Sequence, residues 1–156
     1  MPLRSLLSAA LLVSSTLAGA QQNPSSSSRQ VINRPDARPG GVLSPVVRVG
    51  DLLFLSGVTG SKPGSGGLAD GGIEGQTRQA LENVKSALTL AGATMQDVAK
   101  CTVFLADVKD FGGMNTVYRE YFPTDPPARS TVAVAALVAP NALIEIECIA
   151  ATPQKR

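Results

Sequence analysis

Histidine and tryptophan are both absent from this chain of 156 residues, and aromatic residues make up only 4% of it. Without histidine, no Ser-His-Asp or Cys-His catalytic arrangement can form. Two cysteines alone do not complete a structural zinc site, so no metal site is expected. The net charge is only +2 and the basic residues are scattered, which argues against nucleic acid as a partner. A carboxylate that acts on water is the kind of catalyst that remains available.

The first 20 residues differ in character from the rest of the chain. Arg4 supplies a positive charge, residues 6–17 are apolar or small, and Ala18-Gly19-Ala20 fits an A-x-A cleavage site. A membrane-spanning helix needs about 20 apolar residues, so a retained anchor is the weaker alternative. We therefore predict a signal peptide over residues 1–20, and a periplasmic or secreted protein that does not contact the membrane after cleavage.

Export would place Cys101 and Cys148 in a compartment where a disulfide can persist. Both cysteines nevertheless lie in apolar, strand-like runs, and free cysteine is among the most buried residue types. Buried free thiols are therefore the expectation, with a disulfide as the alternative.

The mature chain divides into a polar segment and one domain. Residues 21–40 contain three prolines and a run of four serines, a composition that buries too little apolar surface to offset chain entropy. We predict a disordered linker over residues 21–40, a domain over residues 41–152 and a C-terminal tail over residues 153–156. A hydrophobic fraction of 44% suffices for one core of this size.

Apolar periodicity within the domain predicts an α+β sandwich in the order ββ-α-β-α-ββ. Two helices can cover only one face of such a sheet, so self-association through the other face is expected. The expected elements are a hairpin of strands 46–49 and 52–55 whose second strand ends at Ser56-Gly57, a helix over 74–91, a strand over 98–105, a helix from about Asp110 to Phe122, and strands over 131–137 and 143–150.

Three side chains in these elements could carry chemistry. Glu145 and Glu147 lie two apart in the last strand, so they project to one face, where they could form an acid/base pair or simply meet solvent or basic partners. Arg129 follows Pro126-Pro127-Ala128, whose prolines stiffen the entrance to a strand. A rigidly held guanidinium suits a carboxylate ligand, since its donors match both oxygens, although a surface ion pair is the alternative.

Four segments together resemble the RidA/YjgF family of enamine/imine deaminases, also called the endoribonuclease L-PSP family. The resemblance spans about residues 41–150 and depends on all four segments, which occur in the family's order. They are Gly50-Asp51-Leu52-Leu53-Phe54-Leu55-Ser56-Gly57, Thr102-Val103-Phe104-Leu105, Pro127-Ala128-Arg129-Ser130-Thr131-Val132 and Ile144-Glu145-Ile146-Glu147-Cys148-Ile149-Ala150.

The resemblance implies a chorismate-mutase-like α+β domain that forms a homotrimer with clefts between subunits. It also implies hydrolysis of small 2-imino acids or their enamines to 2-keto acids and ammonia, without a metal or organic cofactor. Arg129 would bind the substrate carboxylate, and Glu145 would orient the attacking water. Ser56 and Asn115 would complete the polar lining of the cleft.

This chain departs from the family pattern at two positions. Leu43 stands where active deaminases carry a tyrosine, so the hydroxyl that faces the cleft is missing. Thr131 stands where a cysteine is frequent, which matters less if that position acts through its backbone groups. The alternative function is therefore a non-catalytic module that binds small carboxylates such as 2-keto acids. A ribonuclease is disfavoured, because the chain has no basic stripe and no histidine.

Overall fold

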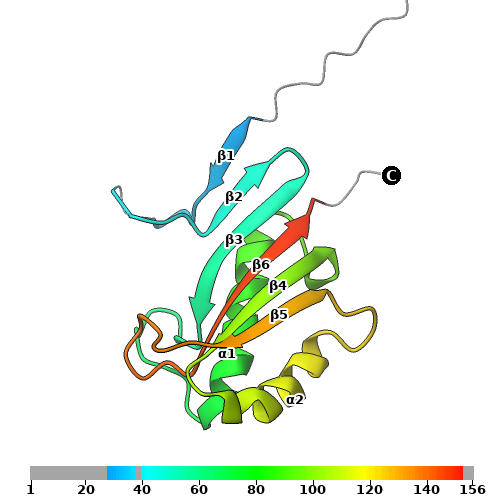
Figure 1. Ribbon diagram of the computed structural model, residues 1–156. Helices are drawn as coiled ribbons and strands as arrows, with labels where there is room; N and C mark the ends of the chain where they lie inside the picture. Colours follow the sequence, from blue (N-terminus) through cyan, green and yellow to red (C-terminus); the bar gives the residue numbers. More distant parts are fainter. Residues whose placement is uncertain (1–27, 38–39, 153–156) are drawn as a thin grey trace, which may run out of the picture.

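The computed structural model describes residues 28–37 and 40–152. The predicted signal peptide, part of the predicted linker and the C-terminal tail lie outside the described residues. The described chain forms one six-stranded sheet in the order β1-β2-β3-β6-β4-β5, with helices α1 and α2 packed on one of its faces (Figure 1). This arrangement confirms the predicted α+β class.

The first strand is an addition to the expected topology. Strand β1 (Arg29–Ile32) pairs antiparallel with β2 (Val46–Val49), although its residues were predicted to belong to the linker. That prediction is wrong for residues 29–32, because the otherwise polar segment contains two adjacent apolar residues, Val31 and Ile32. Val31 aligns with Val47, and Ile32 aligns with Val46 and packs against the core.

The hairpin of β2 and β3 (Leu52–Thr59) is confirmed, and Gly50 at its turn has a φ of 59°. The second strand does not end at Ser56-Gly57 as predicted. It continues to Thr59, because its pairing with β6 (Ile144–Ala151) resumes at Val58 after a register shift. The shift is a β-bulge, in which one extra residue on β3 changes the direction of the side chains that follow it.

The two helices are close to their predicted positions. Helix α1 (Gly72–Leu90) and helix α2 (Phe111–Tyr121) pack against each other and bury the apolar face of each. The 3-10 turns η1 (Met95–Asp97) and η2 (Val108–Asp110) precede β4 (Val98–Leu105) and α2. The largest fully buried side chains of this core are Leu53, Leu81, Leu88, Leu105, Met114, Ile144 and Ile146.

Strand β5 (Ala128–Ala133) begins earlier and ends earlier than the predicted 131–137. It pairs in parallel with β4, from Lys100 opposite Ala128 to Leu105 opposite Ala133. Because β4 ends at Leu105, β5 has no partner strand beyond Ala133. Parallel neighbours require a crossover connection, and α2 supplies it.

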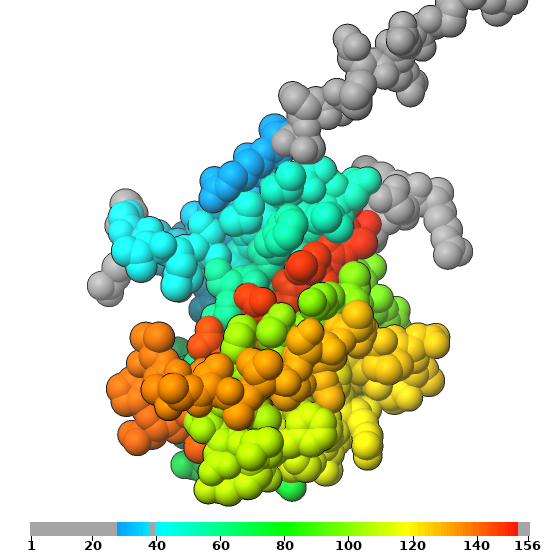
Figure 2. Space-filling view, viewed as in Figure 1, coloured from blue at the N-terminus to red at the C-terminus, as the bar shows by residue number. Residues whose placement is uncertain are grey.

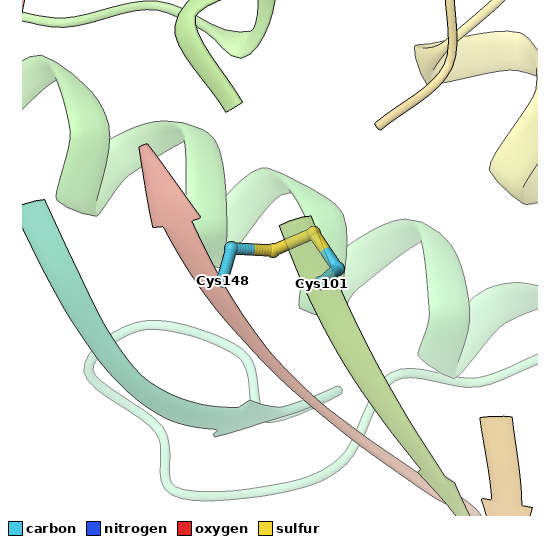
Figure 3. The surroundings of a disulfide bond; sticks show 2 residues. All are labelled: Cys101 and Cys148. Atoms are coloured by element: carbon cyan, nitrogen blue, oxygen red, sulfur yellow. A yellow bond between two sulfur atoms is a disulfide. The ribbon is translucent and has the colours of Figure 1, made fainter. Parts of the chain in front are cut away.

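The two cysteines form a disulfide, so the expectation of free thiols is wrong. Cys101 on β4 lies directly opposite Cys148 on β6, with a Cα–Cα distance of 4.1 Å, and both side chains are buried on the helix-covered face. Figure 3 shows the bond spanning the two neighbouring strands. The alternation in β6 explains the pairing, because Ile144, Ile146 and Cys148 all project into the core as predicted.

Neither α1 nor α2 lies over the other face of the sheet, and strands β2, β3, β6, β4 and β5 reach the surface there (Figure 2). Leu52, Phe54 and Val132 on this open face are exposed. Helices long and apolar enough to cross a membrane were not found within residues 28–37 and 40–152.

Candidate functional site

Five of the six predicted site residues lie in two different pockets of one chain. Arg129 and Asn115 line a pocket of about 350 Å³ between α2 and the start of β5. Leu43, Ser56 and Glu145 line a second pocket of about 790 Å³, beside the end of β3. We call these the arginine pocket and the glutamate pocket.

Arg129 is half-buried and is the second residue of β5, which begins directly after Pro126-Pro127. Its guanidinium carbon lies 4.5 Å from the centroid of the Tyr118 ring, at a distance typical of a cation–π contact, and 5.9 Å from that of Phe111. Its Nη1 also donates to the sulfur of Met114 at 3.7 Å. Among the described residues, no carboxylate forms an ion pair with Arg129. The guanidinium is held by neutral groups, and its charge is available to a ligand.

Tyr118 is a site residue that sequence reasoning missed, because its helical spacing marked it only as a core position. Its hydroxyl is buried without a hydrogen-bond partner in the described chain. Burial raises the pKa of Tyr118 to about 12, against the opposing effect of the Arg129 charge. The hydroxyl therefore stays protonated at neutral pH. Its spacing of three residues from Asn115 on α2 was the available signal.

Thr131 lies two residues after Arg129 on β5, so its side chain is on the same face of the strand. Its hydroxyl is also buried without a partner in the part of the chain that the structure describes. Thr131 does not line the arginine pocket. Its predicted contribution through backbone groups stays a prediction.

Glu145 is half-buried on β6 and aligns with Thr59 of β3. Its carboxylate lies over Gly57, where even a methyl group would overlap with it. None of the ion pairs among residues 28–37 and 40–152 involves Glu145. A carboxylate without a basic partner can accept hydrogen bonds from water or a ligand.

Ser56 and Leu43 line the glutamate pocket together with Glu145. The Ser56 hydroxyl donates to the backbone oxygen of Ser44 at 2.7 Å, which ties the bulge of β3 to the segment before β2. Leu43 is 67% exposed and brings an apolar side chain to the pocket. Asn83 of α1 donates to the backbone oxygens of Thr59 and Ser61, which fixes the opposite wall.

The arrangement can bind a carboxylate at one pocket and position water at the other. A group of three or more His, Cys, Asp or Glu side chains able to hold a metal ion does not occur among the described residues.

Comparison with known proteins identifies the family. The family model described as endoribonuclease L-PSP matches residues 32–152. This chain belongs to the RidA/YjgF family. The chloroplastic Reactive Intermediate Deaminase A of Arabidopsis thaliana is 46% identical over 110 residues, which are 70% of this chain and 58% of that relative. The human 2-iminobutanoate/2-iminopropanoate deaminase is 41% identical over 124 residues, which are 78% of this chain and 89% of the human protein.

Solved structures of RidA/YjgF proteins share the fold. RidA from an Antarctic Psychrobacter bacterium has a TM-score of 0.68 at 35% identity, covering 78% of this chain and 96% of that one. Yeast Mmf1 has a TM-score of 0.73 at 31% identity, covering 81% of this chain and all of that one. The predicted family and its α+β architecture are thereby confirmed.

Proposed function

We propose that this RidA/YjgF protein hydrolyses small 2-imino acids to 2-keto acids and ammonia in clefts between subunits of a homotrimer. The observation that carries the proposal is the unpaired, aromatic-held guanidinium of Arg129 in one pocket and the unpaired carboxylate of Glu145 in another. A single chain presents both halves of a site but not in one place. A second copy, docked on the open face of the sheet, would bring an arginine pocket to a glutamate pocket.

The chemistry follows from the two groups. Arg129 would bind both oxygens of the substrate carboxylate and hold the imine carbon C2 in place. Glu145 would accept a hydrogen bond from a water molecule and direct its oxygen to C2. As the new C–O bond forms, the π bond of C=N breaks and the nitrogen takes one proton of the water, which gives a tetrahedral adduct with a hydroxyl and an amino group on C2. The remaining C–N bond then breaks while the hydroxyl becomes the keto oxygen, and its proton goes to the nitrogen, which leaves as ammonia. Positioning both reactants makes the addition effectively intramolecular.

The test uses 2-iminobutanoate generated in situ by an amino-acid oxidase, and follows its decay. Arg129→Ala should lower kcat/KM by roughly a hundredfold, because losing one partner of a desolvated charge pair costs about 3 kcal/mol. Arg129→Lys should lower the rate as well, since an ammonium group does not reproduce the planar guanidinium donors that match both carboxylate oxygens. Lys85→Ala, on the exposed side of α1, is the matched control and should leave the rate unchanged. Equal rates for wild type and Arg129→Ala would contradict the proposal.

A second candidate function has a specific observation in its favour. Leu43 brings a side chain with no hydrogen-bonding group to the glutamate pocket, where active relatives are expected to have a tyrosine hydroxyl. The cleft would then bind 2-keto acids without turnover. Calorimetric binding of 2-oxobutanoate without acceleration of imine decay supports this candidate. Leu43→Tyr separates the two, because an added hydroxyl should raise the rate about tenfold if only that group is missing.

We also propose that the chain is exported and cleaved after Ala20. The disulfide between Cys101 and Cys148 supports this, since disulfides persist mainly in oxidising compartments. Fractionation of the native host, followed by intact-mass measurement, should find a periplasmic or secreted protein that begins at Gln21. Recovery of the full-length chain from the cytoplasm would contradict export.

A further inference from the structure

We infer that the arginine pocket binds an acid with two carboxylates, and that Arg119 holds the second one. The inference rests on the proposed function for the first carboxylate, at Arg129. It adds a substrate class, the four- and five-carbon 2-imino and 2-oxo dicarboxylic acids, and assigns a specificity role to a residue outside the family motif.

The two arginines line the same pocket from different elements. Arg119 lies four residues after Asn115 on α2, so both side chains project from one face of that helix. Arg129 faces them from the start of β5, behind the stiff Pro126-Pro127 segment. The two arginines are therefore carried by two different elements, and both line one pocket of about 350 Å³.

Within residues 28–37 and 40–152, no ion pair balances the positive charge of this pocket. Its seven lining residues include the two arginines and no acidic residue. The acidic neighbour of Arg119 in sequence, Glu120, is engaged elsewhere, because Arg78 of α1 binds both of its carboxylate oxygens. This ion pair lowers the pKa of Glu120. Among the described residues, neither Arg119 nor Arg129 forms an ion pair.

The two positive charges favour a dianion over a monoanion. A monocarboxylate bound at Arg129 would leave Arg119 without a partner in the pocket, whereas a second carboxylate would give each guanidinium a charged acceptor. Arg119 is exposed, so solvent screens its contribution. One further charged hydrogen-bonded contact of this kind should raise affinity about tenfold.

The experiment is a calorimetric titration of the assembled protein with 2-oxoglutarate and with 2-oxohexanoate, a monocarboxylate of similar length. Wild type should bind 2-oxoglutarate about ten times more tightly. Arg119→Gln should lose this preference while keeping its affinity for 2-oxohexanoate. Lys85→Gln removes one positive charge outside both pockets and should keep the preference.

The outcomes separate this inference from the proposed function. Equal affinity for the two acids in wild type overturns the inference and leaves carboxylate binding at Arg129 intact. A preference that survives in Arg119→Gln, or that Lys85→Gln removes equally, also overturns it, because the net charge and not Arg119 would then be responsible. If neither acid binds, carboxylate binding at Arg129 is contradicted, and with it both this inference and the proposed function.

Discussion

The two faces of the sheet contrast most clearly within β3. Leu53 is completely buried under the helices, whereas its neighbour Leu52 on the open face is 45% exposed. Both faces of the strand are apolar, a pattern typical of strands that are covered on both sides. The comparison indicates that one face stabilises the single chain, and that the other is suited to contact between chains.

The contrast should be sharpest when Leu53 and Leu52 are each changed to Ala. Leu53→Ala opens a cavity in the core and should lower the free energy of unfolding by about 2–5 kcal/mol. Leu52→Ala should change it by less than about 1 kcal/mol in a monomeric background. Denaturant unfolding of both variants measures the difference, and equal losses would contradict the distinction between the faces.

Removal of the disulfide is a second test of how much the helix-covered face contributes to stability. The bond links positions 47 residues apart, and a loop of that length should contribute about 2–4 kcal/mol through the unfolded state. We expect a reducing agent to lower the Tm of wild type, and not that of a Cys101→Ala/Cys148→Ala variant. A wild-type Tm that reducing agent leaves unchanged, with thiol titration showing full reduction, would contradict this expectation.

A charge on the open face should affect assembly more than folding. Phe54→Asp places a carboxylate on this face, where burial against a second copy would leave it without a partner. Sedimentation should then show a shift toward monomer, and far-UV circular dichroism should remain native-like. The rate of imine decay should fall as well, since the proposed site is formed by two subunits. A trimer that persists with full activity would show that this face is not the interface.

A small change in stability is expected from Gly57→Ala, at the bulge under Glu145. Gly57 does not have a positive φ, so alanine fits its backbone, but the added methyl group would overlap with the Glu145 carboxylate. That carboxylate ends a flexible side chain and can rotate away, so we expect a loss below about 1 kcal/mol. The rate of imine decay should fall more than stability does. An unchanged rate would mean that the position of Glu145 does not matter.

The regular elements of the fold could be predicted from the sequence because their patterns are local. The apolar periodicity of residues 74–91 and the alternation of Ile144, Ile146 and Cys148 each fix which side faces the core. The ends of β5 could not be predicted, since they depend on where β4 ends. The same holds for β1, whose two apolar residues gain a partner only when β2 lies beside them.

The candidate site was only partly visible for a similar reason. Arg129 was recognisable because two prolines precede it at the start of a strand. Glu145 was recognisable because it lies on the side of its strand that faces away from the core. The contact of Tyr118 with Arg129 joins a helix to a strand across the fold, and no pattern within either segment encodes it. The disulfide likewise depends on the register of β4 against β6, which places Cys101 opposite Cys148.

The parallel pairing of β4 with β5 has a consequence for the order of folding. Strand β4, helix α2 and strand β5 are consecutive, so the arginine pocket is built from one continuous βαβ segment. The glutamate pocket instead needs β3 to meet β6, from opposite ends of the domain. Contacts that close short loops form faster than those that close long ones. We therefore expect the surroundings of Arg129 to become protected from hydrogen exchange earlier in refolding than those of Glu145.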